Sequence, residues 1–319
     1  MLPDIISTLL ESDEPSIRLK ILRHLFGLAD DSAEIRQLQE EIRTSARVRQ
    51  LLSQRAEDGA IPGSAYAKWI GAHWVLVALA DLAYPPGDLS LVPLREQVLA
   101  WLFSQKHFDS IRTLQGRVRR CASQEGNAIY ALLTLGLADE RCDALAMRLL
   151  VYQWPDGGWN CDKRPLASKS SFMESLIPLR ALSLHARFTG NADSQAAAAR
   201  AAEIFLSRRM FRRRRDGAPM DPHFLTLHYP CYWHYDILFG LSVMAEAGFI
   251  HDPRCQEALD LLESKRLPDG GFPAEERYYT TSQAPSGVSS VDWGGTSQRR
   301  MNPFVTTEAL LVLKAAGRL

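Results

Sequence analysis

The feature that most constrains the fold of this chain is a short sequence pattern that recurs along it. Each copy ends an apolar segment and closes on Gln, Arg or Lys. These closing residues are Gln54, Gln105, Gln153, Arg208 and Lys265, and neighbouring copies lie 48 to 57 residues apart. A repeat of this length holds about one pair of helices and a long loop, so the spacing predicts an array of helical hairpins.

The segment that follows each loop is apolar nearly all round. The five segments are residues 74–79, 127–132, 174–179, 236–241 and 308–313. When they are stacked, the last position is Leu every time and the one before it is mostly small. Small residues let helices approach closely, and a helix that is apolar on every side has to be buried. These segments are therefore expected to be inner helices.

The segments before each closing residue are amphipathic instead. Residues 93–102 and 255–262 place apolar side chains three and four positions apart with charged residues between them, which is typical of a helix with one face in water. Alternating outer and inner helices predict an all-α fold, and specifically an α/α toroid, a double ring of five to six helix pairs. Residues 1–30 are expected to form a helical hairpin that caps the ring or adds a sixth pair, and residues 31–319 the toroid, in one compact domain overall. An open solenoid of helices is the alternative.

Composition narrows the class of protein. The chain has 319 residues, 46% of them hydrophobic, and its 37 basic residues balance its 37 acidic residues. A neutral chain lacks the basic excess of a nucleic-acid binder, so no nucleic-acid partner is expected. The most apolar stretch, residues 70–84, is too short to span a bilayer. The first residues do not resemble a signal peptide and the five cysteines form no C-x-x-C pair, which favours a cytoplasmic protein. The sequence carries no signal for a particular oligomeric state.

One of the loops carries a motif that resembles a known family. Residues 153–159, Gln-Trp-Pro-Asp-Gly-Gly-Trp, are similar to the QW repeat of the prenyltransferase and squalene-cyclase superfamily, and residues 267–272 resemble a second copy. Shorter forms occur at residues 57–59 and 215–217. The resemblance implies an α/α toroid of the terpenoid-cyclase type over most of the chain. Gly-Gly suits a tight left-handed turn and the aromatic residue fills the space between helices, so the motif itself is expected to be structural.

The expected toroid also predicts where a site lies. If the five inner helices run the same way, their first turns meet at one rim. The residues expected there as acids and bases are His73, Glu125, Glu174, His234, Asp236 and Glu308. The residues expected to bind substrate are Trp74, Arg119, Asn127, Trp159, His228, Tyr232, Trp233 and Tyr235. Carboxylates at helix starts also serve as caps, which is the simpler interpretation of each one taken alone.

Zinc is a possible cofactor. Protein prenyltransferases of the superfamily hold zinc with an Asp, a Cys and a His, and the resemblance implies Cys161, Asp162 and His234 as the corresponding ligands. The Asp-x-Cys pair of the family belongs at the start of an inner helix, where this chain has residues 170–174 instead. The chain also lacks the D-x-D-D acid motif of class II terpene cyclases.

The sequence thus favours an enzyme that acts on a small hydrophobic molecule, by resemblance an isoprenoid, through acid and base chemistry in a central cavity. A zinc-dependent hydrolase or lyase that uses the same rim is the second hypothesis. A binding scaffold without catalytic activity is the third, and it predicts that side chains fill the cavity.

Overall fold

The computed structural model describes residues 2–282 and 284–319, so Met1, the first residue of the expected N-terminal hairpin, lies outside the described residues. Most of the described residues are helical, which confirms the all-α class. Its one regular sheet pairs β1 (Arg112–Leu114) with β2 (Arg117–Arg119) in an antiparallel hairpin, with Arg112 opposite Arg119. Among the described helices, none combines the length and the apolar character needed to cross a bilayer.

The five apolar segments form the buried helices of the molecule. These are α5 (Ala72–Asp81), α8 (Ser123–Thr134), α10 (Phe172–Thr189), α12 (Ile237–Glu246) and α14 (Pro303–Ala315). They pack in chain order, α5 on α8, α8 on α10, α10 on α12 and α12 on α14. Their apolar side chains belong to one continuous core. The expected inner helices are therefore present, with Asp236 as the N-cap of α12 rather than its first residue.

A second set of helices alternates with the first along the chain. These are α4 (Ala46–Leu52), α6 (Val92–Leu102), α9 (Glu140–Tyr152), α11 (Ala192–Leu206) and α13 (Gln256–Ser264). Each buries one side and exposes the other, and each packs against one or more buried helices, as α6 does on α5 and α11 on α10. Four shorter elements complete this part: α7 (Gln105–Asp109), η2 (Leu89–Leu91), η3 (Pro222–Leu225) and η4 (Pro253–Cys255).

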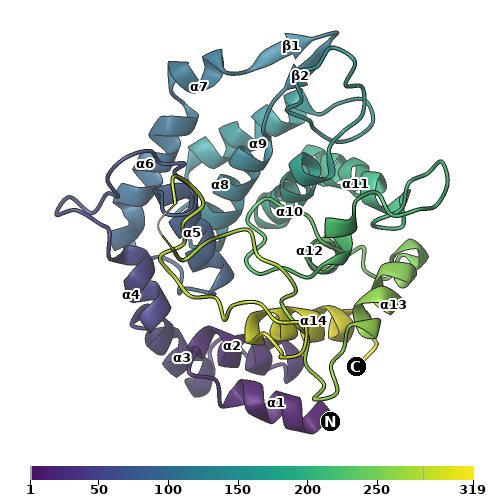
Figure 1. Cartoon of the computed structure of the whole chain (residues 1–319). Coiled ribbons are helices and arrows are strands. Elements are labelled where there is room, and N and C mark those ends of the chain that lie inside the picture. The colour runs from purple at the N-terminus through teal and green to yellow at the C-terminus, as the bar shows by residue number, and fades with distance from the viewer. Residues whose placement is uncertain (1, 283) are drawn as a thin grey trace.

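The N-terminal helices lie against the last helix of the chain. They are α1 (Leu2–Leu10), α2 (Pro15–Lys20), the π-helical turn η1 (Ile21–Leu25) and α3 (Ala33–Arg43). Both α2 and η1 pack on α14, and Figure 1 shows the purple and yellow ends of the chain side by side. The Lys20 ammonium bonds to the Glu308 carboxylate of α14 at 2.5 Å. The N-terminal helices and the last helix of the chain are thus neighbours.

The repeated turns share one pattern of hydrogen bonds. In the first QW motif the Trp154 amide donates to the Gly158 carbonyl at 2.8 Å and the Gly157 amide to the Trp154 carbonyl at 2.9 Å. The same two bonds recur around residues 267–271, and again around residues 56–60, one of the two shorter forms of the motif. The repeat found in the sequence is therefore a repeat of backbone structure.

The aromatic residue that follows the two glycines is held by the next buried helix in both full copies of the QW motif. The Trp159 amide donates to the Ser175 hydroxyl of α10 at 3.1 Å, and the Phe272 amide donates to the Thr306 hydroxyl of α14 at 2.9 Å. Gly157 has a φ of 98°, and a Cβ there would lie 2.4 Å from the Arg200 carbonyl oxygen. Only glycine fits this position, so these motif residues join the helices, as the sequence predicted.

Contacts between the buried helices show which ends meet. The Ser123 amide at the start of α8 donates to the Glu174 carboxylate in the first turn of α10. Next to α10, the Phe172 ring lies 4.9 Å from the Tyr235 ring, which precedes α12. At the opposite ends, the Tyr130 hydroxyl of α8 donates to Asp81 of α5 at 2.8 Å. The helices α5, α8, α10 and α12 therefore start at the same side of the molecule.

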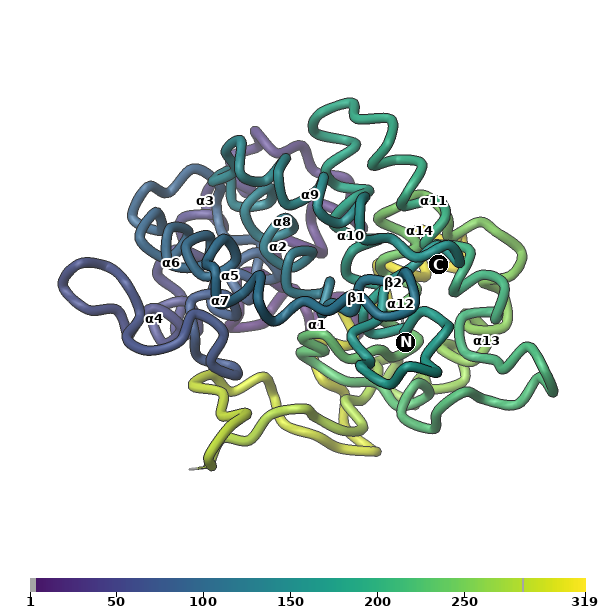
Figure 2. Tube along the Cα trace, turned by 90° about the horizontal axis from the view of Figure 1, so that it is seen from above, coloured from purple at the N-terminus to yellow at the C-terminus, as the bar shows by residue number. Residues whose placement is uncertain are grey.

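The long connection between α13 and α14 covers part of that side. Its residues 276–282 and 284–296 run across the middle of the view in Figure 1, and Figure 2 shows them at one side of the helical body. They are joined to the chain before α5, because the Trp69 amide donates to the Val288 carbonyl and the Trp69 indole to the Tyr278 carbonyl. We call these residues the covering segment.

Candidate functional site

The starts of α8 and α10 meet around a buried carboxyl group. Ser171 caps α10 and thereby fixes the backbone at Glu174, whose side chain turns toward α8. Its Oε2 accepts from the Ser123 amide at 3.0 Å, and its Oε1 lies 3.5 Å from the Cys161 Sγ, which donates to it. Glu174 is 8% exposed, and this burial raises the pKa of the carboxyl group above its usual value. Glu174 thus lies where the starts of α8 and α10 meet.

Two thiols lie beside this carboxyl group. Cys121 precedes α8 and Cys161 follows the QW turn, and the two chain segments are held together by the Arg120 amide, which donates to the Asn160 carbonyl at 3.1 Å. One ligand atom from each of Cys121, Cys161 and Glu174 lies within 4.8 Å of the other two. The hydrogen bond with Cys121, followed by burial, raises the pKa of the Cys161 thiol. Two sulfurs and a carboxylate form a donor set that zinc accepts.

An aromatic cluster adjoins the carboxyl and the thiols. It comprises Tyr66, Trp69, His73, Trp74, Trp101, Tyr232 and Trp233. The Tyr66 ring lies 5.4 Å from His73 and 5.0 Å from Trp101, and the Trp69 and Tyr232 rings stack at 3.7 Å. Burial raises the pKa of Tyr66, and the charges of Glu174, Cys121 and Cys161 add to that shift. Tyr66 is thus the member of the aromatic cluster that lies within electrostatic reach of the Glu174 group.

His73 lies inside this cluster as an uncharged group. It is 1% exposed, and neither of its ring nitrogens has a hydrogen-bond partner among the described residues. Burial lowers the pKa of His73 to about 3. An imidazole in this state contributes a flat apolar surface beside Trp74, so the geometry favours a wall of the site over the base that the sequence suggested.

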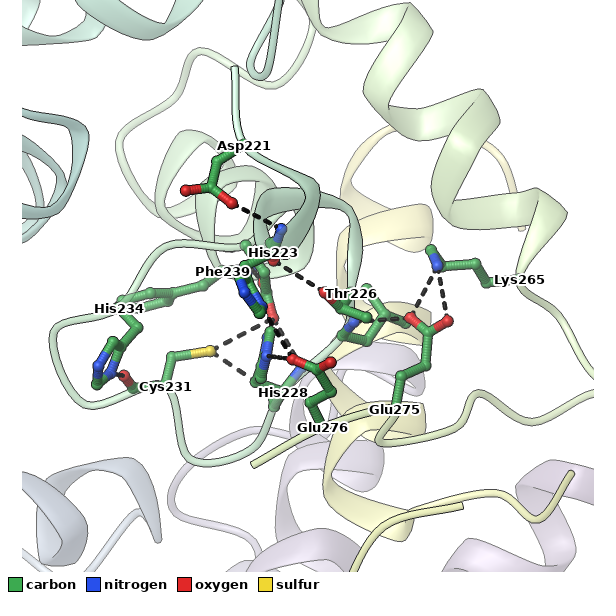
Figure 3. A network of polar contacts seen from close by, with 12 residues as sticks. Asp221, His223, Thr226, His228, Cys231, His234, Phe239, Lys265, Glu275 and Glu276 are labelled. Carbon is green, nitrogen blue, oxygen red and sulfur yellow. Dashed lines mark hydrogen bonds and ion pairs between the residues drawn. The ribbon is translucent and has the colours of Figure 1, made fainter. Parts of the chain in front are cut away.

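A second polar group precedes α12, and Figure 3 shows it from close by. Asp236, fully buried, caps the helix by accepting from the Phe239 amide at 2.7 Å. Its other oxygen accepts from the His228 amide at 2.7 Å and from the His228 Nδ1 at 3.2 Å, and the Cys231 thiol donates to it at 3.5 Å. Each oxygen of Asp236 is therefore occupied, which agrees with the capping interpretation.

His234 belongs to the aromatic side rather than to this polar group. Its Nδ1 bonds to the Cys231 carbonyl at 3.0 Å, and its ring stacks on Tyr278 of the covering segment at 3.4 Å. Figure 3 shows the ring beyond Cys231, away from His228. Burial lowers the pKa of His234 to about 4, so the ring is neutral near pH 7.

The zinc ligands that the resemblance implied are not brought together. Asp162 pairs with the exposed Arg164 at 2.6 Å, and His234 makes the contacts just described. Of the three, Cys161 alone takes part in a possible metal-binding group among the described residues, and its partners there are Cys121 and Glu174. The residues present therefore do not fit the ligand set of the protein prenyltransferases.

Other residues expected at the rim have structural partners. Glu125 is fully buried and forms ion pairs with Arg120 and with Arg148, and the Arg148 Nη1 lies 3.3 Å from its carboxylate. Glu308 pairs with Lys20; burial opposes its ionisation, but the Lys20 charge and hydrogen bond outweigh burial and lower the pKa of Glu308. Both carboxylates are thus held within ion pairs.

Several expected substrate-binding residues also hold the fold together. The Arg119 guanidinium donates to the Ala167 carbonyl at 2.8 Å, and the Tyr235 hydroxyl donates to the Met210 carbonyl at 2.6 Å. The Trp159 indole donates to the Leu149 carbonyl at 3.0 Å. Asn127 is 3% exposed, and its side-chain nitrogen has no partner among the described residues. Trp74, Tyr232 and Trp233, by contrast, do lie in the aromatic cluster.

The cavities near these groups are small or lie elsewhere. The space between α5, Tyr229, Tyr232 and Trp293 has a volume of about 10 Å³, which is at the lower limit for one water molecule. A groove of about 310 Å³ opens instead between α9, α10 and α11, where Asp143, His185 and Asn191 line it. The space beside Tyr232 is thus too small for a substrate in this conformation.

Comparison with known proteins adds no assignment. The chain matches no protein-family model, and no curated protein is similar to it in sequence.

Sequence reasoning missed four residues: Tyr66 and Cys121 of the groups above, and His223 and Glu276, which lie beside His228. Cys121 stands in a polar run just before an apolar helix, and His223 begins the histidine-rich stretch before α12, so both positions gave some signal. Tyr66 and Glu276 lie in irregular segments, where no periodic pattern indicates which way a side chain points.

Proposed function

We propose that the alternating helices form an α/α toroid. The support is the order of packing, in which each buried helix contacts the next and the last, α14, contacts α2 and η1 at the beginning of the chain. The shared direction of neighbouring buried helices and the repeated turns also agree with this arrangement. A toroid of this kind gathers the starts of its inner helices around one mouth.

We further propose that the protein is an enzyme that converts a small, mainly apolar molecule at the joined starts of α8 and α10. The observation that carries this proposal is the buried Glu174 carboxyl group beside two thiols, with Tyr66 of the aromatic cluster within electrostatic reach of it. A carboxyl group whose pKa is raised by burial keeps its proton at a higher pH and is suited to act as an acid.

The reaction that fits this arrangement is proton-initiated isomerisation or cyclisation of an alkene. Glu174 donates its proton to one alkene carbon, so a C–H bond forms from the π electrons, the neighbouring carbon becomes a cation and the carboxylate remains. The faces of Trp74, Tyr232 and Trp233 stabilise such a cation. Return of a proton from the rearranged cation to the carboxylate restores the acid, with no net gain or loss of atoms.

Substrate binding on this proposal requires space that the aromatic cluster now fills. The covering segment and the Tyr232 and Trp233 side chains have to shift, because the volume beside Tyr232 is about 10 Å³. The middle of the covering segment is joined to the chain before α5 by the backbone bonds of Trp69 to Val288 and of Gly287 to Lys68, while its ends are held at Glu276 and at Trp293. Opening of a loop held in this way is a common step in enzymes that exclude water.

The test is turnover of linear polyenes and prenyl alcohols in D₂O, with products identified by mass spectrometry. The wild type is expected to form an isomer that carries one deuterium, and Glu174→Gln to lose this product while its unfolding midpoint stays close to that of the wild type. Glu140→Gln, at an exposed position of α9, is the matched control and retains turnover. Deuterated product at the wild-type rate from Glu174→Gln would refute the role of Glu174 as the acid.

A zinc-dependent hydrolase or lyase is the second candidate, and one observation favours it. The ligand atoms of Cys121, Cys161 and Glu174 lie close enough together to hold one ion, with Tyr66 and the aromatic rings next to them. Zinc at this place would polarise a substrate oxygen or activate a water molecule. Chelation and Cys121→Ser separate the two functions: both abolish turnover if the reaction depends on zinc, and both leave it largely intact if Glu174 acts as a proton donor.

A further inference from the structure

A second group of possible ligands lies outside the Glu174 site. It is formed by His223 in η3, by His228 and by Glu276 in the covering segment, and one ligand atom from each lies within 4.8 Å of the others. The Glu276 carboxylate is 3.0 Å from the His223 Nδ1 and 3.5 Å from the His228 Nε2. Figure 3 shows the carboxylate next to both rings.

His228 is the residue that points to a missing partner. It is 2% exposed, and its Nε2 is buried without a hydrogen-bond partner among the described residues. The opposite ring nitrogen, Nδ1, lies 3.2 Å from the Asp236 carboxylate. A carboxylate accepts hydrogen bonds and donates none, so Nδ1 carries a proton, and in the neutral ring the lone pair of Nε2 faces Glu276. That lone pair lies 3.5 Å from a carboxylate oxygen, which is unfavourable unless a metal ion lies between them or a second proton sits on Nε2.

The backbone around the group is held rigidly, which keeps the three side chains in place. Residues 228 and 276 form a parallel bridge, and the Glu275 amide donates to the Leu227 carbonyl at 2.8 Å. The Glu275 carboxylate, in turn, accepts from the Leu227 amide at 2.7 Å and pairs with Lys265 at 2.7 Å. Glu275 therefore fixes the register of the two segments, while its neighbour Glu276 turns toward the histidines.

We propose that His223, His228 and Glu276 bind a divalent transition-metal ion of the zinc type. Two imidazoles and one carboxylate are a common zinc ligand set, and they leave a fourth position open for water. Asp236 takes the place of the carboxylate that orients a metal-binding histidine through its other nitrogen. The side chains of His223 and Glu276 are 60% and 48% exposed, so an ion reaches the site directly from solvent. This site does not depend on the function proposed for Glu174.

The site links two parts of the chain that no covalent bond joins. His223 and His228 belong to the loop before α12, whereas Glu276 belongs to the covering segment. An ion bound there would tie the covering segment to this loop and raise the free energy needed to lift it.

The experiment is a calorimetric titration of the full chain with ZnCl₂ after dialysis against a chelator. All proteins carry Cys161→Ser, which removes one ligand from the other possible metal group. Co²⁺ is titrated in parallel, because its visible absorption spectrum reports the coordination geometry. His223→Asn and Glu276→Gln remove ligands at exposed positions, so neither is expected to unfold the chain. His251→Asn replaces an exposed histidine of another loop and is the matched control.

One zinc ion per chain is expected for Cys161→Ser alone and with His251→Asn added. His223→Asn and Glu276→Gln are expected to weaken binding by about 100-fold or more, and Asp236→Asn by about 10-fold to 100-fold, as is usual for a residue that orients a ligand. Three results would overturn the proposal: no binding in the Cys161→Ser protein, unchanged affinity in His223→Asn, or a Co²⁺ spectrum that Glu276→Gln does not alter. If no metal binds, a proton on the His228 Nε2 lies between His228 and Glu276. The other two results would mean that the ion is bound elsewhere.

Discussion

The hydroxyl of Thr306 offers a direct measure of what the repeated turn contributes to stability. It accepts from the buried Phe272 amide at 2.9 Å and donates to the Phe272 carbonyl at 3.1 Å. Thr306→Val keeps the shape of the side chain but leaves that amide without a partner. The carbonyl keeps a second donor, the Asn302 amide at 2.9 Å, so one donor alone is left unsatisfied. The loss is expected to be about 1–3 kcal/mol of the free energy of unfolding.

The neighbouring residue is an unusually close control. Thr307 is also buried, at 1% exposure, and lies in the same turn of α14, but its hydroxyl donates to the Pro303 carbonyl four residues back in the same helix. Thr307→Val leaves no donor unsatisfied, because the hydroxyl was itself the donor, and is expected to cost less than about 1 kcal/mol. Urea unfolding followed by circular dichroism gives both values, provided that the two variants have the same m-value.

The comparison extends to the other copy of the motif. The Ser175 hydroxyl accepts a hydrogen bond from the Trp159 amide at 3.1 Å. The loss of stability in Ser175→Ala is therefore expected to resemble that of Thr306→Val and not that of Thr307→Val. If Thr306→Val and Thr307→Val destabilise the protein equally, or if Ser175→Ala has no effect, then the hydrogen bond from the inner helix is not what holds the turn.

Three further predictions concern Leu132 in the core, the ion pair of Lys20 with Glu308, and Asp162, whose pairing with Arg164 argues against a role as a zinc ligand. Leu132→Ala is expected to cost about 2–5 kcal/mol in urea unfolding, because the side chain is fully buried and leaves a cavity; a loss below 1 kcal/mol would argue against a packed α8. The pKa of Glu308 is lower in the folded chain, so its pairing with Lys20 stabilises the protein above the ordinary carboxyl pKa of 4.5 and loses that effect as the pH falls through the folded value. Urea unfolding between about pH 7 and about pH 3 should therefore show wild type and Glu308→Gln converging in acid, and a constant difference would contradict this. Asp162→Asn should leave zinc affinity unchanged in calorimetry, since Asp162 pairs with exposed Arg164, and weaker binding would restore Asp162 as a ligand.

The helices could be predicted from the sequence because burial leaves a pattern along the chain. Residues 74–79 and 127–132 are apolar on every side, and both lie in buried helices. The turn at residues 153–159 could be predicted for a similar reason: Gly157 has a backbone conformation that few other residues adopt, which restricts the choice of residue.

The partners of the polar residues could not be predicted in the same way. Glu125 has the same sequence context as a catalytic acid at a helix start, and only the fold reveals that Arg148, 23 residues away, joins the nearby Arg120 in pairing with it. Glu174 has a similar context but meets the Ser123 amide, 51 residues away, instead of a cation. Whether a buried carboxylate is an anion in an ion pair or a proton donor depends on such distant contacts, and no local pattern records them.

The contact of α14 with α2 and η1 has a consequence for how the protein is made. Lys20 and Glu308, which join these elements, are 288 residues apart, so during synthesis this surface cannot close before α14 has been made. During synthesis α2 and η1 leave the ribosome early with an apolar face that has no neighbour until α14 follows. A nascent chain at that stage is a natural client for a chaperone that shields apolar helices, and slow translation before α14 would prolong its exposure.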